Sequence, residues 1–122
     1  MVVRIAQCTL DVEDLDLMVA FWSAALGYQV DQGDDGSAKL RPPGRSAGAP
    51  TVWLQGSGTA KRGKNRLHLD LVADADPEAE VRRLLSLGAR PVDVGQTGAE
   101  GFTVLADPEG NEFCVLDGPP TR

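Results

Sequence analysis

The stretch RLHLDLVADADPEAEVRRLLSLG, residues 66–88, contains the pattern that decides the fold. Its first residues alternate apolar and polar side chains, which is typical of a half-buried strand. Apolar residues then recur at helical spacing, with charged residues between them. Asp76 before Pro77 predicts the start of this helix, and Gly88 predicts its end. We therefore expect a strand that leads directly into an amphipathic helix.

The same order occurs earlier in the chain, in IAQCTLDVEDLDLMVAFWSAALG, residues 5–27. Gly27 and Gly88, the two glycines that end the helices, are 61 positions apart. The same shift places Gln7 on His68 without a gap. This agreement across strand, loop and helix predicts an internal duplication.

Three further extended runs follow each helix: GYQVDQ, AKLRPP and PTVWLQ in the first half, GARPVDV, GFTVLAD and NEFCVL in the second. The pattern predicts strand–helix–strand–strand–strand, twice. Module one covers about residues 3–55, a polar glycine-rich linker about 56–65, and module two about 66–118. Neither module buries its sheet well alone, so we expect one domain over residues 1–122. The predicted fold is α+β: two βαβββ modules forming a cupped mixed β-sheet around a cleft, with the helices outside.

The composition excludes some classes of partner. The chain has 12 basic and 18 acidic residues and a net charge of −6, which argues against nucleic acid or an anionic membrane surface. No apolar run approaches the roughly 20 residues that span a bilayer, and the N-terminal residues lack the apolar core of a signal peptide. We therefore expect a cytoplasmic protein, and two cysteines suit a reducing compartment.

The alternation of side chains along the strands indicates which residues face a ligand. In each strand, one apolar set suits packing beneath the helices; in residues 66–72 this set is Leu67, Leu69 and Leu71. The opposite set mixes polar groups, a tryptophan, a histidine and a thiol, and a concave surface of this kind is the default ligand site. The candidate ligand-binding residues are Gln7, Trp53, Gln55, His68, Asp70, Glu112 and Cys114.

Three segments together resemble the vicinal oxygen chelate superfamily: LDVEDLDLMVAFWSAALGY, NRLHLDL and DPEGNEFCVL. This superfamily includes glyoxalase I, extradiol dioxygenases and bleomycin-resistance proteins, and the chain is most similar to its small glyoxalase-like domain proteins. The resemblance covers nearly the whole chain. It implies paired βαβββ modules, a small-molecule ligand in the cleft and a homodimer.

The resemblance also implies where a metal ion would bind. Metal-dependent members place a histidine on the first strand of each module and a glutamate or histidine on each last strand. Carried over, Gln7 replaces one histidine, His68 retains the other, and Cys114 stands where the last glutamate is expected. Trp53 or Gln55 takes the fourth position. Neutral amides bind transition metals weakly, so we expect no cofactor and disfavour a divalent metal.

Individual site residues keep two interpretations each. His68 either lines the cleft or acts as a general base, with Asp70 able to orient its ring. Cys114 is either a small buried apolar residue or a nucleophile paired with His68. Glu112 is either an exposed strand-start residue or a ligand contact. The acidic run at 107–110 is more simply a turn than a pair of catalytic carboxylates.

These observations favour a metal-free glyoxalase-like protein that binds a small organic molecule in the cleft between its modules. The alternatives are a metal-dependent lyase, isomerase or dioxygenase of the glyoxalase type, and a metal-independent enzyme with His68 as its base. The sequence leaves open whether the protein is an enzyme. Trp22 is expected in the core, and Trp53 is expected to stack on the ligand.

Overall fold

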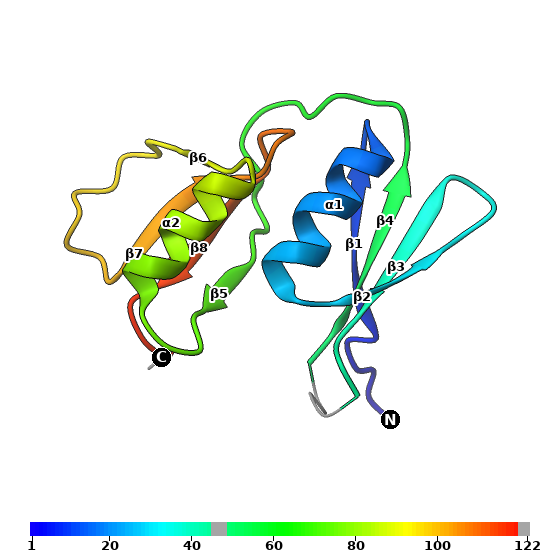
Figure 1. The fold of residues 1–122 in the computed structure, drawn as a ribbon, viewed down its shortest axis with the longest axis horizontal. Coiled ribbons are helices and arrows are strands. Elements are labelled where there is room, and N and C mark those ends of the chain that lie inside the picture. The colour runs from blue at the N-terminus through cyan, green and yellow to red at the C-terminus, as the bar shows by residue number, and fades with distance from the viewer. Residues whose placement is uncertain (45–48, 120–122) are drawn as a thin grey trace. The chain divides into compact units, whose positions relative to one another are not determined.

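The computed structural model describes residues 1–44 and 49–119. The chain divides into two compact units, Met1–Ala60 and Lys61–Arg122. The boundary between them falls inside the segment 56–65. Each unit contains one strand, one helix and three further strands in chain order (Figure 1). The prediction of two βαβββ modules is confirmed.

The first unit consists of β1 (Gln7–Val12), α1 (Leu15–Leu26), β2 (Gln29–Gln32), β3 (Ser37–Arg41) and β4 (Thr51–Gly56). Its sheet has the order β1-β4-β3-β2. β1 runs parallel to β4, and the other neighbouring pairs are antiparallel. The helix therefore connects two strands on the sheet's periphery, and β1 forms one edge of this mixed sheet.

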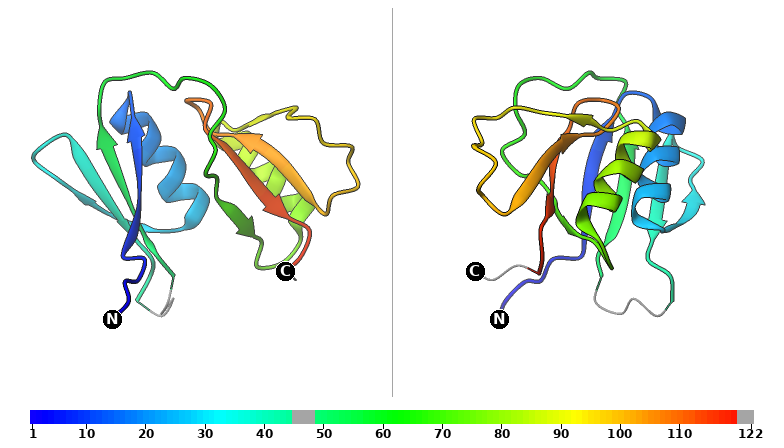
Figure 2. Two further views of the ribbon diagram at one scale, coloured as in Figure 1. Left: turned by 180° about the vertical axis from the view of Figure 1, so that it is seen from behind. Right: turned by 60° about the vertical axis from the view of Figure 1, so that its left-hand side comes forward.

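The second unit repeats this arrangement with β5 (Asp70–Val72), α2 (Pro77–Leu87), β6 (Arg90–Pro91), β7 (Phe102–Ala106) and β8 (Glu112–Leu116). Its sheet has the order β5-β8-β7-β6, again with one parallel pair, β5 with β8. Seen from behind, each sheet lies in front of its own helix (Figure 2). Each unit is thus a sheet covered on one face by a helix.

α2 begins and ends at the predicted residues, and α1 ends at the predicted Gly27. The Asp14 carboxylate accepts a hydrogen bond from the Leu17 N–H at the start of α1, and Asp76 accepts one from Glu78 at the start of α2. These bonds satisfy amide groups that have no partner inside a helix. Gly27 ends α1 with φ of 67°, in the left-handed region that favours glycine.

The core of each unit lies between its helix and its sheet. In the first unit, α1 buries Met18, Phe21 and Trp22, and the rings of Phe21 and Trp22 meet edge to face at 5.1 Å. Trp22 is 2% exposed, so its predicted core position is confirmed. In the second unit, the most deeply buried apolar side chains come from α2, β7 and β8: Leu84, Leu105, Phe113 and Val115.

The register of the parallel strands repeats between the units. Thr9 pairs with Trp53 in the first sheet, and Asp70 pairs with Cys114 in the second. Both members of the second pair stand 61 positions after those of the first, which is the shift found in the sequence. Trp53, and not Gln55, is therefore the residue equivalent to Cys114.

The first strand of the second unit is shorter than its sequence pattern indicates. The alternation in residues 66–72 predicted that Leu67 faces the core, but β5 begins at Asp70 and Leu67 is 89% exposed. The pairing with β8 begins where the carbonyl of Leu69 accepts a hydrogen bond from the Cys114 N–H. Before that residue, the chain is held by hydrogen bonds from Asn65 to side chains of the β7–β8 turn and of β8. Since this segment is not part of the sheet, the alternation of its residues does not indicate which side chains face the core.

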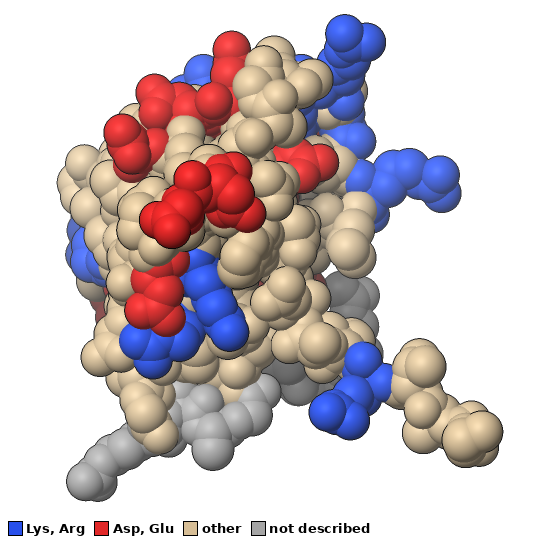
Figure 3. All heavy atoms as spheres, turned by 90° about the vertical axis from the view of Figure 1, so that its right-hand side faces the viewer, with Lys and Arg blue, Asp and Glu red and all other residues tan. Residues whose placement is uncertain are grey.

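Acidic side chains form the larger charged groups on the face of the molecule drawn in Figure 3, in keeping with the net charge of −6. Basic side chains lie mainly toward the edges and the lower part of the same view. Over residues 1–44 and 49–119, neither helix has the length and apolar character needed to cross a bilayer.

Candidate functional site

Three of the predicted site residues meet on one face of the second sheet. Oδ1 of Asp70 lies 3.3 Å from Nδ1 of His68, and both side chains are partly exposed. Potential ligand atoms of His68, Asp70 and Cys114 all lie within 4.8 Å of one another. Asp70 and Cys114 are register partners on neighbouring strands, so their side chains project from the same face.

This cluster opens into a hollow of about 200 Å³ within the second unit. Its polar walls come from the cluster, from Lys64 and from Glu112. Val94, Phe102 and Val104 supply an apolar wall. A few polar groups beside an apolar surface are the usual composition of a small-molecule site. We call this hollow, with those eight lining residues, the sheet-face pocket.

Strand alternation explains which side chains reach the sheet-face pocket. Phe102 and Val104 on β7 are two residues apart, and Val104 pairs with Cys114 on β8. The intervening Thr103 pairs with Val115, which is buried on the opposite, helix-covered face. The pocket therefore takes every second residue of three neighbouring strands, while their neighbours pack under α2.

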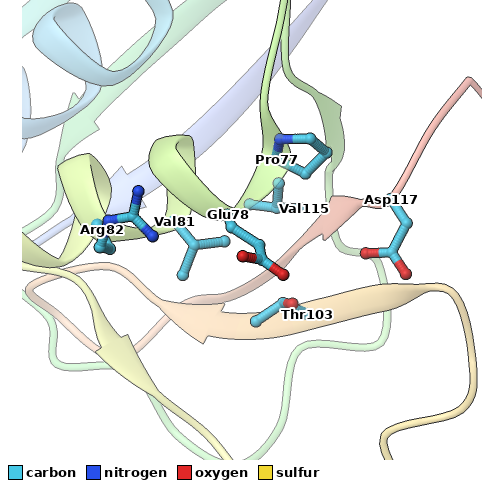
Figure 4. Close-up of a pocket in the computed structure, with 7 residues that line it drawn as sticks. All are labelled: Pro77, Glu78, Val81, Arg82, Thr103, Val115 and Asp117. Atoms are coloured by element: carbon cyan, nitrogen blue, oxygen red, sulfur yellow. The ribbon is translucent and has the colours of Figure 1, made fainter.

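A second hollow, of about 260 Å³, lies on that helix-covered face (Figure 4). Val81, Thr103 and Val115 line its apolar part, because these short side chains do not fill the space between helix and sheet. Glu78 and Asp117 point their carboxylates toward it from either side (Figure 4). None of the predicted site residues lines this hollow.

The surroundings of Cys114 oppose its use as a nucleophile. The residue is 6% exposed. Burial raises the pKa of the Cys114 thiol above its ordinary value, and the Asp70 carboxylate raises it further through its charge and a hydrogen bond. Since the thiolate is the reactive form, a raised pKa disfavours nucleophilic catalysis at neutral pH.

Glu112 lines the pocket with a carboxylate that already has partners. Oε1 accepts a hydrogen bond of 3.0 Å from the Asn65 N–H and lies 3.2 Å from Nζ of Lys61. Burial works to raise the pKa of Glu112, but the Asn65 N–H and the Lys61 ammonium hold it below its ordinary value. Its main contacts are therefore with the segment that precedes β5.

The other three predicted site residues lie in the first unit, on the face of its sheet turned away from α1. Oε1 of Gln7 accepts a hydrogen bond of 3.4 Å from the Thr51 hydroxyl, and Oε1 of Gln55 accepts one of 3.0 Å from Nε1 of Trp53. Trp53 alternates with the buried Val52 and Leu54, as the sequence predicted. Their contact with a ligand stays a prediction.

The acidic run after β7 is a turn. Asp107 is fully buried, and its carboxylate accepts hydrogen bonds from the N–H groups of Glu109 and Asn111 and from the Asn111 side chain. Gly110 follows with φ of 92°, a conformation that favours glycine. The carboxylate of Asp107 is thus used to close the turn, away from the sheet-face pocket.

The donor atoms near His68 provide a test of whether a metal ion fits. Imidazole, carboxylate and thiolate are all strong ligands, and three protein ligands with one open position describe many catalytic zinc sites. The resemblance placed two strong donors here, His68 and Cys114. Asp70 is a third strong donor beside them. Within the first unit, the positions expected to supply further ligands carry only the amides of Gln7 and Gln55 and the indole of Trp53. The second-unit set fits a three-ligand ion by itself.

Sequence reasoning missed the apolar wall and Lys64. Phe102 and Val104 lie two residues apart on β7 and therefore share a face, and that strand periodicity was a usable signal. Val94 had none, because it lies in the irregular segment between β6 and β7. Lys64 lies in the segment predicted to be a polar linker, and only the folded path of residues 61–65 brings it to the pocket.

Comparison with solved structures supports the fold. A FosX fosfomycin resistance protein from Listeria monocytogenes, in complex with Mn(II) and a dihydroxypropylphosphonic acid, aligns with a TM-score of 0.73 and 16% identity over 98% of this chain and 93% of that one. FosX from Mesorhizobium loti gives 0.71 and 17% over 98% and 94%. A glyoxalase/bleomycin resistance protein from Albidiferax ferrireducens gives 0.66 and 22% over 94% and 98%. These similarities show a shared fold.

The sequence itself matches the family described as glyoxalase-like domain over residues 7–116, from the first residue of β1 to the last of β8. No match was found among functionally curated proteins. The family match covers both units and agrees with the solved structures in fold. The chain therefore belongs to the glyoxalase-like domain family, within the fold of the vicinal oxygen chelate proteins.

Proposed function

We propose that this protein binds a small organic molecule in the sheet-face pocket without a metal ion. The observation that carries the proposal is the meeting of an apolar wall, made by Val94, Phe102 and Val104, with the polar cluster around His68. At about 200 Å³, the pocket suits a molecule smaller than a typical drug. The ligand contacts predicted for Trp53 and the two glutamines of the first unit stay predictions.

Within this proposal, His68 is the group that contacts the ligand most directly. Oδ1 of Asp70 lies 3.3 Å from Nδ1, where the carboxylate can accept a hydrogen bond from an Nδ1–H group, which leaves Nε2 of the ring to meet a hydroxyl or N–H group of the ligand. The same arrangement would let His68 act as a base in a metal-independent enzyme. The predicted homodimer and cytoplasmic location stay predictions.

Binding at this pocket is testable by fragment screening with amide NMR spectra. Fragments that bind are expected to shift the signals of residues 68–70, 102–104 and 112–114. Phe102→Ala removes much of the apolar wall and is expected to weaken binding about tenfold. Thr103→Ala is the matched control, because the neighbouring side chain points to the helix-covered face. Equal binding by the two variants would contradict the proposal.

A metal-dependent lyase, isomerase or dioxygenase is the second candidate, and the donor set of His68, Asp70 and Cys114 favours it. These three residues would hold the ion, and a bound divalent ion would polarise vicinal oxygen atoms of a substrate. The ion would have to displace the proton of a thiol whose pKa is raised. That cost is the reason why we place this candidate second.

Elemental analysis separates the two candidates. Protein offered zinc, nickel, iron and manganese and then dialysed is expected to retain far less than one equivalent of any of them. His68→Ala and the exposed-residue control Asp74→Asn should then not differ from the wild type. Near-stoichiometric metal in the wild type and Asp74→Asn, lost in His68→Ala, would establish the metal-dependent alternative instead.

A further inference from the structure

Residues 61–65 form a strap that Glu112 holds against the second unit. Nζ of Lys61 lies 3.2 Å from one carboxylate oxygen of Glu112, and the Asn65 N–H donates to the same oxygen at 3.0 Å. The Asn65 side chain also donates to Oδ1 of Asn111 at 3.3 Å. The Lys61 and Glu112 side chains are only 17% and 12% exposed, so this ion pair is largely shielded from solvent. Both ends of the strap are therefore attached at the start of β8.

Lys64 sits between these two attachment points and lines the sheet-face pocket. Its Nζ contacts a backbone carbonyl, that of Asn65, at 3.4 Å. Within the described part of the chain, no carboxylate lies within ion-pair distance of this ammonium group. Burial and Asp70 raise the pKa of Cys114, and the charge of Lys64 is the contribution that lowers it. The positive charge of Lys64 therefore acts on the interior of the pocket.

Both carboxylates that line the pocket already have partners. Asp70 contacts the His68 ring, and Glu112 is paired with Lys61. Lys64 also lines the pocket, and a negatively charged group of a ligand could form an ion pair with it. An anionic group beside Lys64 would place the rest of a small molecule against the apolar wall on β7.

We propose that Glu112 is a positioning residue that holds the strap and, through it, Lys64, so that the pocket selects an organic anion. The anion's carboxylate or similar group pairs with Lys64, and its apolar part meets Phe102 and Val94. This inference rests on the proposed function, because it names the class of ligand for the same pocket.

Cys114 provides a reporter that needs no natural ligand. In a Cys8→Ser background it is the only thiol, and it lines the pocket. Iodoacetate and iodoacetamide are nearly equal in size and differ in charge. With either reagent, the thiolate sulfur bonds to the reagent carbon, iodide leaves, and the thiol proton passes to the buffer. Mass spectrometry of the peptide that contains Cys114 gives both rates, and their ratio cancels changes in thiol pKa.

The expected result is a fall in the iodoacetate-to-iodoacetamide ratio of about threefold in Lys64→Gln, the effect of one charge a few ångströms away in a watery site. Lys64→Arg should keep the wild-type ratio. Arg62→Gln is the matched control, since it removes the same charge from the same strap at a residue that does not line the pocket. Equal ratios in Lys64→Gln and Arg62→Gln would overturn the proposal.

The Glu112→Gln variant distinguishes a role of Glu112 in holding the strap from the direct effect of its negative charge on the two reagents. Removal of a negative charge by itself should raise the ratio, whereas release of the strap should lower it toward the Lys64→Gln value. We expect the fall, and a rise would overturn the positioning role. If this variant does not fold, the comparison of Lys64→Gln with Arg62→Gln decides the anion preference alone. Fragment binding that fails while the ratios behave as expected would refute the proposed function and leave the electrostatics of the pocket standing.

Discussion

Replacement of Asp107 by alanine is expected to lower the free energy of unfolding by about 3–4 kcal/mol. The carboxylate is fully buried and accepts hydrogen bonds from two backbone N–H groups and from the Asn111 amide, at 2.9–3.1 Å. Without it, these donors lose their partners in a site where water enters poorly. Because burial of an unpaired donor costs about 1–3 kcal/mol, three such donors make this one of the most sensitive positions in the chain.

Chemical denaturation followed by circular dichroism measures this effect. Asp107→Asn keeps one acceptor oxygen but turns an N–H₂ group toward the Asn111 amide, so we expect an intermediate loss of about 2 kcal/mol. Asp117→Ala is the matched control, an exposed carboxylate just after β8, and should change stability by less than about 0.5 kcal/mol. A stable Asp107→Ala variant would mean that the turn does not depend on this carboxylate.

Replacement of Trp22 by alanine is expected to lower the free energy of unfolding by about 4 kcal/mol. The indole is 2% exposed, packs edge to face on Phe21, and lies between α1 and its sheet. Alanine would leave a cavity in the core of the first unit that the surrounding strands cannot fill. Trp53→Ala removes a side chain of the same size from a partly exposed position and should cost about 1 kcal/mol.

The fluorescence of the remaining tryptophan provides the measurement for each variant. In Trp22→Ala, the signal of Trp53 reports unfolding of the first unit directly. Trp22→Phe, which keeps most of the apolar volume, should recover about half of the loss. If Trp53→Ala proved the more damaging change, the assignment of core and ligand-facing surfaces in the first sheet would be reversed.

The helices were predictable from sequence because their information is local. Asp14 and Asp76 cap the first turns, Pro77 occupies the first turn of α2, and Gly27 and Gly88 end the helices. Each of these preferences acts over three or four residues, so no distant contact is needed to recognise it. The duplication was visible for the same reason, since both copies repeat these local signals at one spacing.

The site was predictable only in part. Alternation placed Asp70 and Cys114 on one face, because that property belongs to each strand alone. It also let Asp70 lie beside the His68 ring. It did not show that the Cys114 thiol would come within 4.8 Å of both, which depends on the register of β5 with β8. It also placed Leu67 wrongly in the core, because the strand begins only at Asp70.

The sequence by itself determined the two βαβββ repeats, their helix ends and the turn at residues 107–110, all of which rest on short-range propensities and periodicity. Only the tertiary structure decided what the polar residues do. Glu112 pairs with Lys61 and Asn65, 51 and 47 residues away, and Lys64 reaches the pocket, because the folded chain brings residues 61–65 against the start of β8. Such contacts depend on the folded path of the chain, and no local pattern of residues encodes them.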